Sequence, residues 1–150
     1  MKHSLFTSPE VWREMIKPHY VELFGYLKSK GLIIVHHADS FLEPIAADMA
    51  GMDVDVWQGV LPQNDIVRLQ KELAGRMTLM GGIDAAVVDT PTTTEEEIRA
   101  ETRRACETYG PGGHFIPSFT YGGPGDMIYK AGDAIISDEV ARYNRETYGA

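Results

Sequence analysis

The fold is decided by residues 32–40, which read Leu-Ile-Ile-Val-His-His-Ala-Asp-Ser. The first part is aliphatic and mostly β-branched, is too short for a helix, and follows Gly31. It therefore predicts a strand buried on both faces. The stretch ends in ionisable side chains at His36, His37 and Asp39. Open α/β sheets bind their ligands in this position, at the carboxyl ends of buried strands.

The same pattern recurs in weaker form along the chain. Three further apolar segments lead into polar or glycine residues: 53–57 before Gln58, 77–80 before Gly81-Gly82 and Asp84, and 114–116 before Ser118 and Tyr121. Parallel strands present their carboxyl ends on one side of a sheet, so we expect these polar side chains to face one region.

Helical patterns separate the strands, at about 9–30, 42–51, 64–75, 93–109 and 138–147. Ser8 is in position to cap the first helix, and Pro18 inside it predicts a kink or a junction of two helices. Asn64 is the expected cap of the third helix. Thr93 and Glu96 have the spacing of a capping box for the fourth.

This alternation calls for a parallel sheet with right-handed crossovers. An open doubly wound sheet and four βα units of an eight-stranded barrel both satisfy it. No Gly-x-Gly-x-x-Gly pattern follows the first strand, which disfavours a dinucleotide-binding sheet. A barrel places its active site on the loops after the strands, where the polar residues fall here.

Composition narrows the functional classes. With 150 residues and 43% hydrophobic content, the chain predicts a single domain over 1–150. A net charge of -8 without a basic stripe argues against nucleic acid as a partner. No apolar run approaches the roughly 18 residues of a membrane span. Cys106 is the single cysteine, and we expect a cytoplasmic protein.

Four blocks of sequence carry a family resemblance: Phe-Thr-Ser-Pro-Glu-Val-Trp-Arg at 6–13, His-His-Ala-Asp at 36–39, Met-Gly-Gly-Ile-Asp at 80–84 and Gly-Gly-His-Phe-Ile at 112–116. Together they resemble the carboxyl-terminal half of the uroporphyrinogen decarboxylase superfamily. That superfamily includes porphyrinogen decarboxylases and zinc-dependent methyltransferases that serve corrinoid proteins. The resemblance implies a (β/α)8 TIM barrel of which this chain forms the second half.

The chain differs from the methyltransferase branch at the positions of the zinc ligands. That branch carries His-x-Cys after the strand and a further cysteine in the last glycine-rich loop. Here His36 matches the histidine, Ala38 stands at the cysteine position, and the last loop offers Ser118, Thr120 and Tyr121. Zinc needs three or four good ligands, so we expect no directly bound metal or cofactor, with any corrinoid carried by a partner protein.

The decarboxylase branch implies a polycarboxylate substrate and hence cationic partners. Its last loop has His-Gly where this chain has Tyr121-Gly122, and the strand tips here carry Asp39, Gln58 and Asp84. The leading hypothesis is therefore part of a methyltransferase or O-demethylase that acts with a corrinoid protein. A uroporphyrinogen-type decarboxylase of tetrapyrrole biosynthesis and a non-catalytic binding or assembly domain are the alternatives.

The candidate residues follow from these positions. The catalytic candidates are His36, Asp39, Asp84 and Tyr121, and the candidates for substrate binding are His37, Gln58 and Ser118. Adjacent strand residues point to opposite faces, so at most one of the two histidines faces a barrel interior. We expect a histidine, Asp39 and Asp84 to converge on one concave surface and to use acid/base or hydrogen-bonding chemistry in preference to metal binding.

Assembly is the last expectation. Four parallel strands of a barrel leave two open edges and an apolar interior face exposed to water. We therefore expect self-association or pairing with a complementary amino-terminal half, and enzyme activity from the complete barrel.

Overall fold

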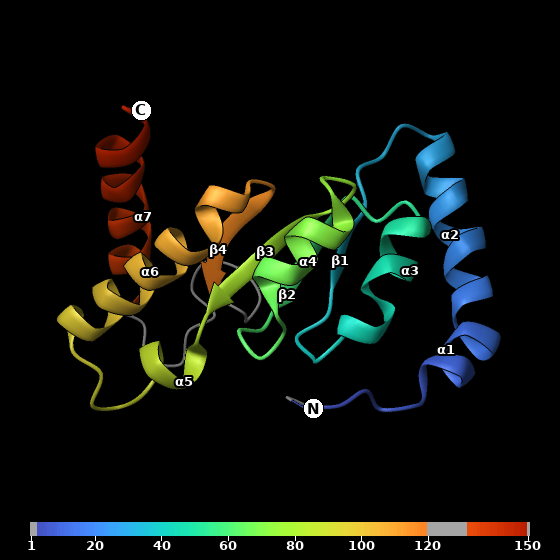
Figure 1. The fold of residues 1–150 in the computed structure, drawn as a ribbon, viewed down its shortest axis with the longest axis horizontal. Helices are drawn as coiled ribbons and strands as arrows, with labels where there is room; N and C mark the ends of the chain where they lie inside the picture. The colour runs from blue at the N-terminus through green and yellow to red at the C-terminus, as the bar shows by residue number, and fades with distance from the viewer. Residues whose placement is uncertain (1–2, 120–131, 150) are drawn as a thin grey trace.

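A computed structural model describes residues 3–119 and 132–149. Its strands form one parallel sheet in the order β1-β2-β3-β4 (Figure 1). They are β1 (Val35–His37), β2 (Val56–Val60), β3 (Thr78–Ile83) and β4 (Phe115–Phe119). The α/β prediction is confirmed, and the sequential order of neighbouring strands is that of part of a (β/α)8 barrel.

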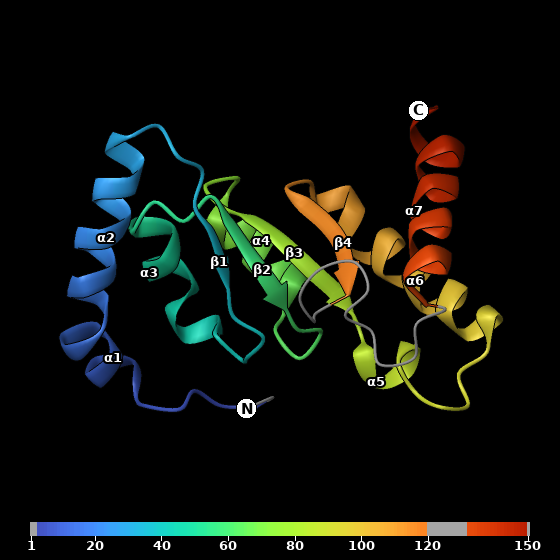
Figure 2. The same ribbon diagram turned by 180° about the vertical axis from the view of Figure 1, so that it is seen from behind.

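The helices of the described residues come before, between and after these strands in the chain. They are α1 (Pro9–Met15), α2 (Lys17–Ser29), η1 (Glu43–Ile45), α3 (Ala46–Gly51), α4 (Ile66–Leu73), α5 (Ala85–Val88), α6 (Glu95–Tyr109), η2 (Gly110–Gly112) and α7 (Gly132–Tyr148). Helix α4 lies in front of the sheet in Figure 1 and behind it in Figure 2. None of these helices is long and apolar enough to cross a membrane.

Helices cover one face of the sheet, and the described residues leave the other face, here called the open face, without a covering element. Trp57 and Leu79 are fully buried in the core on the helix side. On the other side Val35 is 57% exposed and Ile116 is 42% exposed. The prediction of a first strand buried on both faces is therefore wrong, because no element among the described residues covers the second face.

Each strand begins later and ends later than the sequence pattern predicts. β1 contains both histidines, β2 continues through Gln58 to Val60, β3 runs through the glycine pair, and β4 reaches Phe119. Polar and glycine residues were interpreted as loop signals. A face that is not packed against helices tolerates them within the strand, so the ladder continues past the apolar run.

The first helix breaks where proline predicts. α1 ends at Met15 and α2 begins at Lys17, so Pro18 lies in the first turn of α2, where its missing N–H is not needed. Ser8 is the N-cap as expected, accepting a hydrogen bond from the Val11 N–H at 3.3 Å.

Two other helix starts differ by one residue from prediction, and the last helix starts several residues earlier than expected. The capping box is formed by Thr94 and Glu97, and the N-cap of α4 is Asp65. Asn64 instead is buried and binds backbone groups of two loops. α7 begins at Gly132. At the starts of α4 and α6, two polar residues that could each serve as the N-cap are adjacent in sequence. Tertiary contacts decide which of the two caps the helix.

The glycine pair in β3 adopts backbone conformations that favour glycine. Gly81 and Gly82 have φ of +150° and +79°. A Cβ added to Gly81 would lie 2.4 Å from the Val60 carbonyl oxygen, next to the register shift between Gln58 and Val60. Glycine thus allows β2 and β3 to approach closely at the end of the sheet.

We expect Gly81→Ala to lower the free energy of unfolding by more than about 1 kcal/mol, because the backbone conformation and the contact with Val60 both oppose a side chain. Urea denaturation followed by circular dichroism measures the change. Gly25→Ala is the matched control: nothing lies within 4 Å of its added Cβ, and it sits inside α2. It should stabilise the chain by about 0.5–1 kcal/mol. Equal losses in both variants would contradict this account.

Candidate functional site

The strand register divides the central residues into two rows. His36, Trp57, Leu79 and Phe115 are aligned across the sheet and belong to the helix-covered face. The next row, one residue further along each strand, is His37, Gln58, Met80 and Ile116. Because successive strand residues alternate, this second row lies on the open face.

His37 and Gln58 form a pair on the open face. His37 Nδ1 lies 2.5 Å from Gln58 Oε1. A side-chain amide oxygen only accepts hydrogen bonds, so Nδ1 must carry the proton and donate it. The neutral imidazole then has its lone pair on Nε2, free to accept a proton or a hydrogen bond. Gln58, a candidate for substrate binding, thus orients the histidine beside it.

Asp39 lies two residues beyond His37, in the loop after β1, and is exposed. It makes no hydrogen bond or ion pair with residues 3–119 or 132–149. The N–H of Ala38 donates to the Gln58 carbonyl oxygen at 2.9 Å, which holds the start of this loop against β2. A Cβ at Gly59 would come within 3.3 Å of the Asp39 nitrogen, so glycine there keeps β2 close to this loop.

His36 faces the helices. Its ring centroid lies 5.2 Å from that of Tyr20 and 5.7 Å from that of Phe24, both on α2. Burial lowers the pKa of His36, and the neighbouring His37 lowers it further. The expected division of the two histidines therefore holds, but the catalytic candidate was His36, and the histidine on the open face is His37. We assign the histidine of the site to His37.

Asp84 lies at the same end of the sheet as Asp39, after β3. Its Oδ1 accepts the Ala86 N–H at 3.0 Å and so caps α5, and its own N–H donates to Glu101 Oε1 at 2.8 Å. β2 separates β1 from β3, which places the strand ends roughly 10 Å apart at the usual strand spacing. The common end agrees with the expectation, and the capping bond gives Asp84 a structural role.

The last two candidates come from the end of the sheet. Ser118 pairs in register with Gly82, one step beyond the His37 row, and its Oγ donates to the Phe119 carbonyl oxygen at 2.8 Å. Tyr121 lies outside the described residues, as does Thr120. The described part of the site is therefore His37, Gln58, Asp39 and Ser118 on the open face and the strand ends.

A buried ion pair braces the end of β3. Glu101 is 8% exposed and binds Arg104 through both carboxylate oxygens, at 2.6 and 2.7 Å. Arg104 also donates to the Gly82 carbonyl oxygen at 2.8 Å, while Glu101 accepts from Asp84. A charge-rich helix such as α6 is ordinarily expected to present a solvated face. Glu101 lies three positions after buried Ile98, so helical periodicity alone could have predicted its burial.

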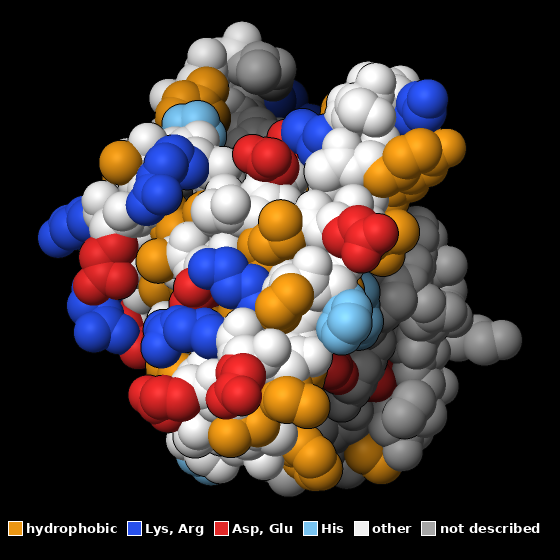
Figure 3. Space-filling view, turned by 90° about the vertical axis from the view of Figure 1, so that its right-hand side faces the viewer, with side chains coloured by type: hydrophobic (Ala, Val, Ile, Leu, Met, Phe, Trp, Pro, Cys, Tyr) orange, Lys and Arg blue, Asp and Glu red, His pale blue; other side chains and the backbone are white. Residues whose placement is uncertain are grey.

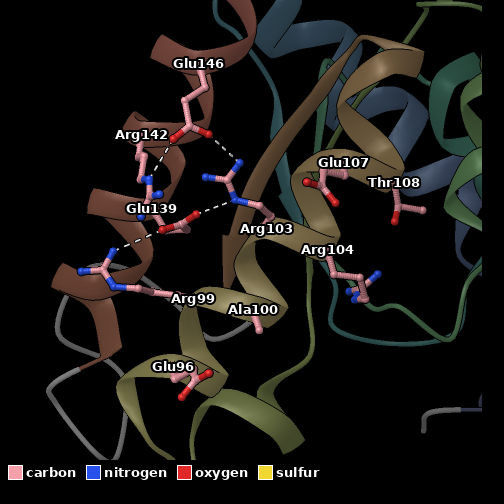
Figure 4. A pocket seen from close by; sticks show the side chains of 10 residues that line it. All are labelled: Glu96, Arg99, Ala100, Arg103, Arg104, Glu107, Thr108, Glu139, Arg142 and Glu146. Carbon is pink, nitrogen blue, oxygen red and sulfur yellow. Dashed lines mark hydrogen bonds and ion pairs between the residues drawn. The ribbon is translucent and has the colours of Figure 1, made fainter.

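A second charged cluster joins α6 to α7. Glu139 is 3% exposed and accepts from Arg103 at 2.7 Å and from Arg99 at 3.2 Å, across a hollow of about 470 Å³ (Figure 4). Glu146 accepts from Arg103 and Arg142, each at 2.8 Å. Four arginines and four glutamates line the hollow, and the contacts of Glu139 and Glu146 fix the two helices together.

The outer side of α1 and α2 shows mixed charge. In Figure 3 basic, acidic and hydrophobic side chains are interspersed over this side of the molecule. Arg13 and Lys17 bind Asp48 at 2.9 and 2.7 Å, and Lys28 binds Asp55 at 2.8 Å. These pairs leave no continuous positive field on this side of the molecule that would attract a phosphate backbone.

The donor set of the described residues does not fit a zinc ion. No group of three His, Cys, Asp or Glu side chains among residues 3–119 and 132–149 is arranged to hold a metal. Cys106 is buried in α6, and burial raises its pKa to about 11, which disfavours the thiolate that zinc requires.

Comparison with known proteins gives a structural match. The chain matches no protein-family model, and no curated protein matches it in sequence. Among solved structures it is similar to a methyltransferase from Methanosarcina mazei, with a TM-score of 0.68 and 19% sequence identity over 91% of this chain. It spans 38% of the length of that protein. At this identity the common feature is the fold, which is that of part of a TIM-like barrel.

The lowered pKa of His36 predicts a pH dependence of stability. The unfolded chain binds a proton at His36 below about pH 6.5, whereas the folded chain binds it only at lower pH. Stability from this residue is therefore present above about pH 6.5 and is lost as pH falls through the folded pKa. His36→Phe keeps a ring against α2 and should flatten the dependence in that window. Urea midpoints of both proteins between pH 5 and 7.5 measure it; parallel curves would contradict the burial of His36.

Glu101→Gln keeps the shape of the side chain and removes the charge that binds Arg104. We expect a loss of on the order of 2 kcal/mol, less than the ~3–5 kcal/mol of a fully buried pair, because the Arg104 side chain is 40% exposed. The control, Glu72→Gln, removes an exposed pair with Arg68 and should change stability by less than about 0.5 kcal/mol. Chemical denaturation distinguishes the two variants.

Proposed function

We propose that this chain supplies one half of a (β/α)8-barrel methyltransferase or O-demethylase of the uroporphyrinogen decarboxylase superfamily, acting with a corrinoid protein. The observation that carries the proposal is the likeness to a methyltransferase over 91% of the chain at a TM-score of 0.68. The sequence blocks at 6–13, 36–39, 80–84 and 112–116 support the same superfamily.

The site suits transfer of a methyl group to an acceptor that carries a proton. As the acceptor atom forms its bond to the methyl carbon, its proton must leave, and the former methyl donor keeps the electron pair of the broken bond. In this proposal His37 Nε2 takes that proton, which is supported by the bond to Gln58 that keeps the ring proton on Nδ1. Asp39, two residues further along the chain, would stabilise the imidazolium that results. The corrinoid of a partner protein would carry the methyl group to or from this site.

The proposal requires a partner for the open face. β1 and β4 are the edges of the described sheet, and Val35 and Ile116 expose apolar area beside the site. A complementary amino-terminal half, or a second copy of this chain, would provide the further strands of an eight-stranded barrel. The site would then lie inside the barrel mouth, where exclusion of water strengthens hydrogen bonds such as that between His37 and Gln58.

The decarboxylase alternative has less support. A polycarboxylate substrate needs unpaired cations at the strand ends. Arg104 reaches the carbonyl of Gly82, but Glu101 neutralises it with two hydrogen bonds. The alternative would therefore have to draw its cations from residues beyond the described part of this chain.

The test is methyl transfer by the chain together with its complementary half, from a methylated corrinoid protein to a thiol acceptor. His37→Ala should lower kcat/KM by about 10²–10⁴, the usual contribution of a general base. His19→Ala, a change at an exposed position of α2, is the control and should retain activity. Unchanged activity in a folded His37→Ala protein would remove His37 from the mechanism, and absence of transfer by the wild-type assembly would overturn the methyltransferase proposal.

A further inference from the structure

A separate apolar cavity of about 260 Å³ lies between the N-terminal segment and the loop after β1. Residues 4–7 form one side of it. Trp12 of α1 and Ile16 from the junction with α2 form a second side, and Leu42 and Ile45 form a third. Three separate segments of the chain thus surround a space that the core does not fill.

The cavity lies at the end of the sheet that carries the candidate site. The N-terminal segment runs along the lower edge of Figures 1 and 2, the side toward which the strand arrows point. Ser40, which lines the cavity, directly follows Asp39 in sequence. A ligand in the cavity would therefore contact the same loop that holds Asp39.

The loop wall is fixed by a buried side chain. Asn64 Oδ1 accepts the Leu42 N–H at 2.9 Å, and Asn64 Nδ2 donates to the Ser40 carbonyl oxygen at 3.2 Å. Asn64 also donates to Leu61 O at 3.1 Å, which ties the wall to the loop after β2. Preformed walls of this kind are typical of small-molecule sites, since little order has to be gained on binding.

The chemistry of the lining selects an uncharged ligand. Among the described residues no charged side chain lines the cavity, and the hydroxyls there are those of Ser4, Thr7 and Ser40. Burying an ionised group here would leave the charge unpaired, which is strongly unfavourable. A single hydroxyl on an otherwise apolar molecule, by contrast, would find a hydrogen-bond partner among the three.

Size restricts the ligand further. A cavity of about 150 Å³ accommodates benzene, so 260 Å³ fits one substituted ring and excludes a macrocycle such as a tetrapyrrole. The Trp12 indole and the Phe6 ring are aromatic surfaces against which such a ring can stack. Phe6 is 85% exposed, so a bound ring would also remove apolar area of Phe6 from water.

We propose that this cavity binds a small neutral aromatic molecule, one ring bearing a hydroxyl group. The proposal does not depend on methyl transfer by the open face. It assigns to the N-terminal segment and α1 the role of walls of a binding site.

The experiment titrates the 150-residue chain with p-cresol and follows Trp fluorescence together with calorimetry. We expect saturable binding, and at least about tenfold weaker binding of benzoate, which has a similar ring but carries a charge. 2-Naphthol, with two rings, should also bind at least about tenfold more weakly. Absence of saturable p-cresol binding, or equal affinity for benzoate, would overturn the proposal.

Two variants locate the site. Ser40→Leu fills the cavity and should weaken p-cresol binding at least about tenfold, whereas Ser137→Leu adds the same side chain to exposed α7 and should leave affinity unchanged. Phe6→Ala changes an exposed side chain without disturbing the core, so it tests the site if Ser40→Leu does not fold. Binding that neither Ser40→Leu nor Phe6→Ala alters would place the ligand elsewhere and overturn the proposal.

Discussion

Coverage of the parallel sheet by helices on a single face is the constraint from which the rest of this structure follows. The covered face must be apolar, and His36 is accommodated there only as a ring packed on Tyr20 and Phe24. The open face has no such requirement, so Gln58 and His37 can stand in register with Met80. The polar candidate residues and the core residues are neighbours in sequence. They lie on opposite faces of the sheet because successive strand residues alternate in direction.

The residues that position the site lie outside it. Asn64 holds the loop after β1, and Glu101 with Arg104 holds the end of β3 through backbone groups. Each of these groups is bonded to main-chain atoms, which fixes the strand ends while leaving the side chains of His37 and Asp39 exposed. Stability and function therefore fall on different residues, which allows a site side chain to change without loss of the fold.

The sequence was sufficient for the order of elements, for the parallel sheet and for the break near Pro18, because each depends on local pattern. It could not decide which histidine faces outward, since that requires the pairing of His36 with Trp57 across strands. The hydrogen bond between His37 and Gln58 could likewise not be predicted, because only the pairing register of β1 and β2 makes these residues neighbours. The burial of Glu101 could be predicted from helical periodicity. A charged side chain, however, is ordinarily expected to face solvent.

The open face resembles an interior more than a surface. Val35 and Ile116 expose more than a third of their area on either side of a polar pair, a mixture that water does not favour and a barrel lumen does. The sheet edges are poor templates for pairing: β1 has three residues, and β4 contains Pro117, which lacks an N–H. Closure of a barrel would therefore depend less on new ladder hydrogen bonds than on burial of this face. A partner that closed the barrel would have to match the row of His37, Gln58, Met80 and Ile116 in shape and polarity, so the candidate site would form part of the surface that selects it.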